Sequence, residues 1–195
     1  MLRLPSHPRS HARRHTPGPL ISKRYPLSAI RWFLLLCTLY PVPCTLLEGC
    51  NRTSHPAQVG ERAPAIVIRD GAQTVSLRQY QTQGKVVVLN FWASWCPPCL
   101  EEFPSLIDLQ RRMPNVVVLA VSFDTDANAY RQYVVDNHIA GIITILDLSQ
   151  RSNTAFDTTR PPETYIIDRN GIIRRKFIGA QDWTTSEIIN YLQNL

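Results

Sequence analysis

Two cysteines separated by two residues carry most of the chemical information in this sequence, in the stretch Trp95-Cys96-Pro97-Pro98-Cys99. Two thiols at this spacing can close a disulfide with each other. The other cysteines, Cys37, Cys44 and Cys50, lie in or at the end of an N-terminal leader. A structural disulfide framework would use more cysteines at wider spacings. Within the body of the chain, the pair therefore predicts a redox-active dithiol.

The segments on either side of the pair predict how the two thiols are placed. Residues 85–91 form an apolar, β-branched run, typical of a strand buried on both faces. Apolar residues recur at helical spacing from Pro98 to Arg112, and proline suits the first turn of a helix. We therefore expect Cys96 just ahead of a helix N-terminus, where the helix dipole stabilises a thiolate. Cys99 lies one turn inside the helix, so Cys96 is the predicted nucleophile and Cys99 the resolving thiol.

Three other interpretations of the pair are less well supported. A zinc half-site needs further ligands, and the body offers only His55 and His138 without a second cysteine pair. A structural disulfide across four residues would close a very short loop and stabilise little. A peroxidatic cysteine would have threonine three residues earlier, where this chain has Ala93.

The remaining pattern predicts an α/β fold. Buried-type strands alternate with helices, and a C-terminal hairpin around the turn 168–171 precedes a last helix, which Thr185 or Ser186 would cap. This order predicts a three-layer α/β/α sandwich with a central mixed sheet. The further strands are expected over residues 65–69, 74–76, 116–122, 142–146, 164–167 and 172–178, and the further helices over 127–138, 149–156 and 186–195.

The net charge of +6 does not indicate a nucleic-acid partner. Seven of the 21 basic and one of the 15 acidic side chains lie in residues 1–49, which leaves 14 of each in the rest of the chain. A neutral body argues against binding to nucleic acid by bulk electrostatics.

The leader has the composition of an export signal. A basic stretch precedes the apolar run 32–47, which at about 16 residues is short for a spanning helix. The run ends in Leu47-Glu48-Gly49-Cys50, which resembles the bacterial lipoprotein cleavage box with Cys50 as the lipid attachment site. An uncleaved N-terminal anchor is the alternative, and both place the domain outside the cytoplasm. We therefore predict an export signal or anchor over residues 1–50, a linker over 51–63 and a single domain over 64–195.

Two sequence blocks together resemble the TlpA/ResA-like, membrane-tethered thiol–disulfide oxidoreductases. The first runs from Asn90 to Pro104 and contains both cysteines; the second runs from Pro162 to Gly171. With the entry segment Val59–Pro64, the resemblance covers about residues 58–195. It implies a thioredoxin-like fold with an added N-terminal β-hairpin, and exchange chemistry that needs no cofactor or metal.

The resemblance also assigns roles to single residues. Pro162 matches the family's cis-proline, which faces the disulfide and shapes the substrate groove. Glu102 matches an acidic residue near the active site, which would tune the titration of the cysteines and carry protons; a solvated helix face is the alternative. Trp95 would be a contact surface beside the disulfide and Trp92 core packing. The prolines 97 and 98 would complete the substrate-binding side.

This chain departs from the thioredoxin pattern at two positions. Asn90 replaces a buried aspartate, which leaves Glu102 as the proton acceptor. Pro161 directly precedes Pro162, where the backbone normally pairs with a substrate strand. Because proline has no N–H, we predict a one-sided main-chain clamp on the substrate.

The resemblance implies a disulfide reductase in the bacterial cell envelope, on the periplasmic side of a membrane. Its partners would be disulfide-containing exported proteins such as apocytochrome c, and a membrane thiol donor of the DsbD/CcdA type. The same family includes reductases for copper-delivery proteins and general thiol oxidants. A non-catalytic copper or haem module is disfavoured, because the body has Met113 as its single methionine and few histidines.

Overall fold

The computed structural model describes residues 57–195, so the predicted signal, Cys50 and residues 51–56 of the predicted linker lie outside the described residues. The order of the elements is the predicted one. They are β1 (Val67–Asp70), β2 (Gln73–Ser76), α2 (Leu77–Thr82), β3 (Val86–Trp92), α3 (Pro97–Arg112), β4 (Val116–Ser122), α4 (Ala127–Asp136), β5 (Ile143–Leu146), α5 (Arg151–Phe156), β6 (Glu163–Ile167), β7 (Ile173–Ile178) and α6 (Ser186–Gln193).

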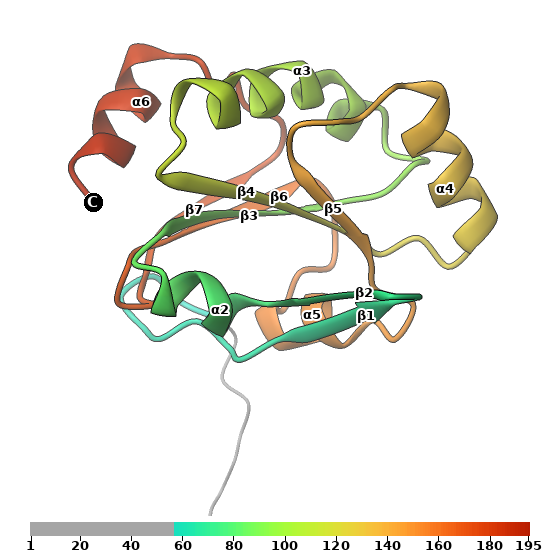
Figure 1. Cartoon of the computed structure of the whole chain (residues 1–195), viewed down its shortest axis with the longest axis horizontal. Coiled ribbons are helices and arrows are strands. Elements are labelled where there is room, and N and C mark those ends of the chain that lie inside the picture. Colours follow the sequence, from blue (N-terminus) through green and yellow to red (C-terminus); the bar gives the residue numbers. More distant parts are fainter. Residues whose placement is uncertain (1–56) are drawn as a thin grey trace, which may run out of the picture. The chain divides into compact units, whose positions relative to one another are not determined.

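A mixed sheet with the strand order β5-β4-β3-β6-β7 forms the middle layer. Strands β3, β4 and β5 are parallel, whereas β6 runs antiparallel to β3 and β7 antiparallel to β6. Strands β1 and β2 pair as a separate antiparallel hairpin. Helices α3 and α6 lie over one face of the sheet, and the hairpin with α2 and α5 lies over the other (Figure 1). The structure confirms the three-layer sandwich, its mixed sheet and the added N-terminal hairpin.

The central strand β3 is buried along its whole length. Its residues alternate between two apolar clusters, because successive side chains of a strand point to opposite faces. Val86 and Val88 pack in the cluster that includes α3 and α6 residues, whereas Val87, Leu89 and Phe91 pack in the cluster that includes the hairpin. Burial on both faces explains why this strand is a continuous apolar run.

Helices α4 and α5 are each two residues shorter than predicted. Helix α4 ends at Asp136 rather than at residue 138, and His138 has the left-handed φ of 50°. Helix α5 begins at Arg151 rather than at residue 149. The Asp147 carboxylate accepts hydrogen bonds from the Ser149 and Ser152 backbone N–H groups, and Gln150 between them has a φ of 56°. The aspartate side chain thus competes with the helical backbone for these donors.

The end of the predicted linker is hydrogen-bonded to the domain. Gly60 N–H donates to the Ile173 carbonyl (2.8 Å), Ala63 N–H to the Gly171 carbonyl (2.8 Å), and Ile173 N–H to the Glu61 carbonyl (2.9 Å). The Ala63 side chain is buried. The domain therefore begins several residues before the predicted boundary at residue 64. Within residues 57–195, no helix has the length and apolarity needed to cross a membrane.

Candidate active site

The two cysteines of the motif form a disulfide at the N-terminus of α3, with an S–S distance of 2.05 Å. Cys96 is the N-cap residue of the helix, and its Sγ accepts a hydrogen bond from the Cys99 backbone N–H at 3.3 Å. Helix α3 starts at Pro97, one residue earlier than predicted. The N–H groups and the dipole of the helix therefore stabilise a thiolate on Cys96. Cys96 is 4% exposed and Cys99 0%, so Cys96 is the more accessible sulfur.

The predicted substrate-side residues lie next to the cysteines in the chain or just before β6. Pro97 and Pro98 are exposed, and Trp95 is 63% exposed. The bond between Pro161 and Pro162 is cis, as the resemblance implied. The next residue, Glu163, pairs with Phe91 near the end of β3. The proline pair therefore lies at the edge of the sheet from which the cysteine loop leaves.

Trp92, in contrast, is fully buried. Its ring packs edge-on against Phe103 at 4.7 Å and beside Tyr130 and Tyr133 of α4. The two tryptophans of the motif thus have the predicted different environments, one in the core and one in solvent.

Glu102 is buried behind the disulfide, three residues after Cys99 on the same helix, and is 2% exposed. Its Oε1 accepts a hydrogen bond from Asn90 Nδ2 (2.6 Å). Its Oε2 accepts from the Gln181 backbone N–H (3.1 Å) and from Trp183 Nε1 (3.2 Å). The neighbouring Glu101 is exposed. The solvated-face alternative therefore applies to Glu101 and not to Glu102.

Burial raises the pKa of Glu102 above its ordinary value, and this effect outweighs the hydrogen bonds from Gln181, Trp183 and Asn90, which lower it. A carboxyl group with a raised pKa can gain and lose a proton closer to neutral pH. Residues three apart on a helix lie on the same side. Glu102 therefore lies on the same side of α3 as Cys99.

Asn90, which replaces the buried aspartate of the thioredoxin pattern, contacts Glu102 directly. Its Nδ2 also donates to Thr164 Oγ1 (2.9 Å), whereas its Oδ1 has no partner among the described residues. The residues Thr164, Gln181 and Trp183 were not identified from the sequence. They lie more than 60 residues from Glu102. Thr164 is part of the second block of the resemblance, which assigned it no role, and no motif marks Gln181 or Trp183.

A second buried carboxylate, also missed, lies at the end of β4. Asp124 is 1% exposed and accepts hydrogen bonds from the backbone and the hydroxyl group of Ser94. Ser94 is two residues before Cys96, so this contact fixes the loop that carries the nucleophile.

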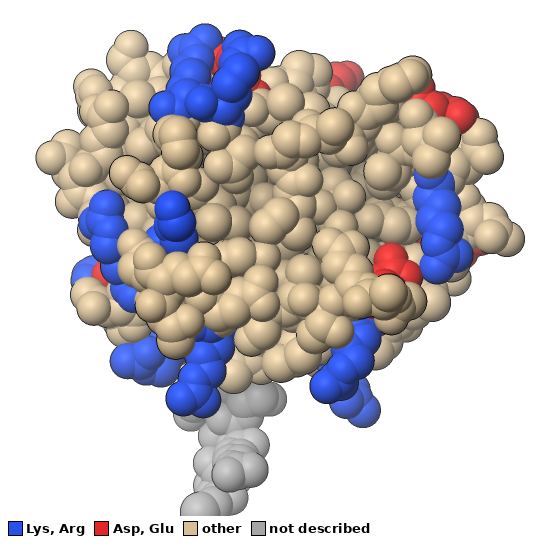
Figure 2. All heavy atoms as spheres, in the orientation of Figure 1, with Lys and Arg blue, Asp and Glu red and all other residues tan. Residues whose placement is uncertain are grey.

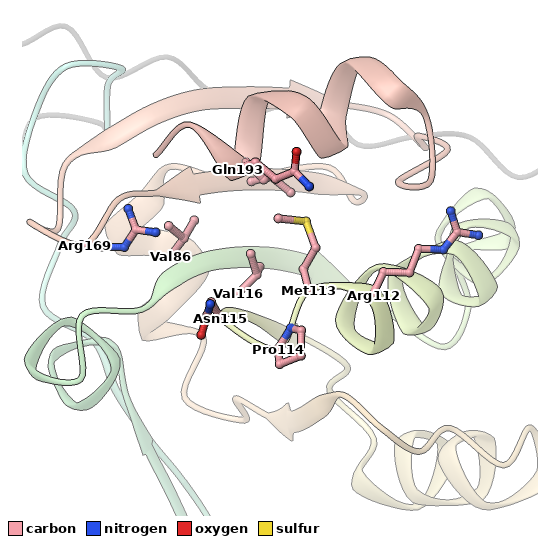
Figure 3. Close-up of a pocket in the computed structure, with 9 residues that line it drawn as sticks. Val86, Arg112, Met113, Pro114, Asn115, Val116, Arg169 and Gln193 are labelled. Carbon is pink, nitrogen blue, oxygen red and sulfur yellow. The ribbon is translucent and has the colours of Figure 1, made fainter.

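The described residues contain no group of three His, Cys, Asp or Glu side chains placed to hold a metal ion. A cavity of about 230 Å³ lies elsewhere, lined by Val86 and Val116 at the first residues of β3 and β4 and by Met113, Arg112 and Arg169 (Figure 3). The cysteines follow the opposite end of β3, so this cavity is not part of the disulfide site.

A disulfide at the N-terminus of α3, a cis-proline at the same sheet edge and a buried acid behind the resolving cysteine define a thioredoxin-like thiol–disulfide exchange protein. The family model described as Redoxin matches residues 58–193. The chain is 28% identical to the thiol-disulfide oxidoreductase ResA of Bacillus cereus over 171 residues, which cover 85% of this chain and 94% of that protein. It is 30% identical to the thiol:disulfide interchange protein DsbE of Pseudomonas aeruginosa over 129 residues, which cover 65% of this chain and 69% of that protein.

Solved structures agree with the fold. The thioredoxin domain of a thiol-disulfide oxidoreductase from Bacteroides vulgatus matches with a TM-score of 0.60 at 20% identity, covering 70% of this chain and 96% of that one. A thiol:disulfide interchange protein from Bacteroides sp. matches with a TM-score of 0.59 at 20% identity, covering 71% and 90%. The chain belongs to the Redoxin family, within the TlpA/ResA-like group of the thioredoxin superfamily, and is a thiol–disulfide oxidoreductase.

Proposed function

We propose that this protein is an exported, membrane-tethered reductase of protein disulfides. The observation that carries the proposal is the buried Glu102 behind Cys99, with three hydrogen-bond donors around it and a raised pKa. Resolution of a mixed disulfide requires a thiolate on the buried Cys99, and a buried carboxyl of raised pKa on the same side of α3 supports Glu102 as its proton acceptor.

The first step starts from the reduced protein. The Cys96 thiolate attacks one sulfur of the client disulfide, so that a Cys96–client bond forms and the client S–S bond breaks. The departing client sulfur leaves as a thiolate and takes a proton from water. Cys96 is suited to this step because it is the more accessible of the two sulfurs and caps α3.

In the second step, Cys99 loses its proton to Glu102 and attacks Cys96. The Cys96–Cys99 disulfide forms, the mixed disulfide breaks, and the second client thiol is released. Two electrons have then passed from the protein to the client. A separate dithiol donor must return two electrons before the next cycle.

The location and the partners in this proposal rest on the sequence. The apolar leader and Cys50 support export and anchoring on the periplasmic side of a membrane, with Cys50 lipidated or the leader uncleaved. The resemblance to ResA and DsbE supports apocytochrome c or other exported proteins as clients. It also supports a membrane donor of the DsbD/CcdA type.

The reduction potential of the Cys96–Cys99 pair tests the direction of transfer. Equilibration with glutathione buffers should give a value nearer to the roughly −270 mV of thioredoxin than to the roughly −120 mV of the oxidant DsbA. A value near that of DsbA would instead assign the general oxidant function. A low potential combined with selective reduction of a copper-delivery protein would assign that protein as the client in place of apocytochrome c.

Paired cysteine variants test the assigned order of attack. Cys96→Ser should abolish insulin reduction, and Cys99→Ser should accumulate a mixed disulfide with the client, detectable by mass spectrometry. Trapping through Cys99 in the Cys96→Ser variant would reverse the assignment.

A further inference from the structure

Trp95 is the exposed aromatic residue next to the nucleophile, and the structure holds it in place from one side. Its ring lies edge-on to the ring of Phe123, with a centroid distance of 6.2 Å and an interplanar angle of 79°. Phe123 is half-buried and packs against the apolar cluster beneath the sheet. The indole is thus supported on one side and open to solvent on the other.

The residue before Trp95 is fixed by the residue after Phe123. Asp124 Oδ2 accepts a hydrogen bond from the Ser94 backbone N–H (3.0 Å), and Asp124 Oδ1 accepts one from Ser94 Oγ (2.8 Å). Ser122 Oγ donates to Asp124 Oδ2 (2.6 Å) and accepts from the Asp124 backbone N–H (3.0 Å). All side-chain and backbone partners of this buried carboxylate donate to it, so its orientation is fully determined.

A backbone hydrogen bond completes the connection between the two segments. Phe123 N–H donates to the Trp92 carbonyl at 3.1 Å. Two consecutive residues at the end of β4 therefore hold three positions of the loop that leads to Cys96. Such a loop loses little further freedom when a partner binds, and preorganisation of this kind raises affinity by lowering the ordering cost.

We propose that Phe123 and Asp124 are positioning residues for substrate recognition. Together they hold Trp95 as a preorganised aromatic anchor for the polypeptide on either side of a client's disulfide. A protein client can cover the open side of the indole, whereas a small disulfide can reach Cys96 without covering it. The residues therefore favour protein disulfides over small-molecule disulfides. This inference rests on thiol exchange at Cys96 and on neither the direction of transfer nor the identity of the client.

The test compares two second-order rate constants for the pre-reduced full-length chain, measured by stopped flow with insulin and with 5,5′-dithiobis(2-nitrobenzoate). Their ratio cancels any change in the reactivity of Cys96 itself. Asp124→Asn and Phe123→Leu should each lower the insulin-to-small-disulfide ratio by about fivefold, because the second-order rate constant for insulin falls while that for the small disulfide is unchanged. Ser94→Ala should also lower this ratio. Because this variant keeps the buried Asp124 carboxylate, it provides the test if Asp124→Asn fails to fold.

A double-mutant cycle shows whether the effect passes through Trp95. In a Trp95→Ala background, Asp124→Asn should cause no further fall in the ratio. Asp126→Asn is the matched control, because Asp126 lies two residues on and caps α4 through Asn128 N–H without contacting Ser94. An unchanged ratio in Asp124→Asn, an equal fall in the Trp95→Ala background, or an equal fall in Asp126→Asn would each overturn the inference. If the protein is an oxidant rather than a reductase, the measured reduction potential will show it, and the rate ratio expected here stays the same.

Discussion

The environment of Glu102 can accept both protonation states of its carboxyl group. As a carboxylate, Glu102 accepts from Asn90 Nδ2, while Asn90 Oδ1 has no partner among residues 57–195. If the Asn90 amide turns over, Oδ1 faces Glu102 and accepts a hydrogen bond from the protonated acid. Asparagine at this position can therefore form a hydrogen bond with Glu102 in either protonation state. An ionised aspartate could only accept hydrogen bonds and would repel the carboxylate.

Replacing Glu102 with glutamine tests its role as proton acceptor. Glutamine keeps the shape and, through the same turn of Asn90, the hydrogen bonds, but it cannot take the proton of Cys99. We expect release of the second client thiol to slow by about tenfold or more at pH 7. Stopped-flow measurement of this step from pH 5.5 to 9 gives the profile. Glu101→Gln, at the exposed neighbouring acid, is the control, and identical pH profiles for Glu102→Gln and the wild type would refute the role.

The same variant should change how stability depends on pH. Because burial raises the pKa of Glu102, the folded protein keeps this proton to a higher pH than the unfolded chain, whose pKa is about 4.3. Between these two pKa values the folded state binds more protons, so its stability falls as the pH rises. Glu102→Gln lacks this fall. Its free energy of unfolding in urea, relative to that of the wild type, should therefore rise over that pH window by about 1.4 kcal/mol per unit of pKa shift. A constant difference from pH 4 to pH 8 would contradict it.

At the scale of elements, Glu102 joins helix α3 to the loop between β7 and α6. Trp183 in this loop donates to Glu102 through Nε1, and its backbone N–H donates to Ser105 Oγ on α3 (3.2 Å). Its ring is fully buried and packs edge-on against Phe177. The loop is thus held by hydrogen bonds to the Glu102 carboxyl, so we expect the protonation of Glu102 to affect the stability of this loop.

Trp183→Phe removes the indole donor and keeps an aromatic ring. We expect a loss of about 1–3 kcal/mol in the free energy of unfolding at pH 8, where Glu102 is more ionised, and a smaller loss at pH 5. Urea unfolding at the two pH values measures both. Trp92→Phe is a matched control, because Trp92 is equally buried but its Nε1 has no hydrogen-bond partner among the described residues. The loss in the free energy of unfolding of Trp92→Phe should not depend on pH. The same pH dependence in both variants would argue against a link between the protonation of Glu102 and the stability of the loop.

The molecule as a whole places its exchange chemistry at one edge of the sheet and its N-terminal entry on the turn between β6 and β7. The described surface carries its Lys and Arg side chains in separate groups, with a broad uncharged area between them on the face shown in Figure 2. A single basic patch of the kind that binds nucleic acid is not visible on that face, in agreement with the balanced charge of the body.

The N-terminal entry should contribute to the stability of the whole domain. A chain that starts at residue 65 lacks the three backbone hydrogen bonds of Gly60, Glu61 and Ala63 and the buried Ala63 side chain. Compared with a chain that starts at Ala57, we expect a loss of about 2–4 kcal/mol in the free energy of unfolding, measured in urea. Equal unfolding midpoints would mean that residues 57–63 belong to the linker, which the sequence predicts over residues 51–63.

The sequence by itself predicted the order of the elements, the exchange motif and the identity of the nucleophile. These follow from local physics: the spacing of apolar residues reports strand and helix, and the spacing of two cysteines places them one helical turn apart. Asn90 and Pro161 also stood out, because each departs from a family pattern at a known position. The boundaries of α4 and α5 were missed, since they depend on side-chain hydrogen bonds such as those of Asp147.

Only the tertiary structure brought together the groups that surround the motif. Glu102 is held by Asn90, Gln181 and Trp183, which come from β3 and from the loop before α6. Asp124 reaches Ser94 from the end of the neighbouring strand β4. Contacts between such distant segments depend on how strands pair and helices pack, and no local pattern encodes them. The cysteines and Glu102 can therefore be identified in the sequence, whereas the residues that hold Glu102 and the loop before Cys96 in place are identified only in the fold.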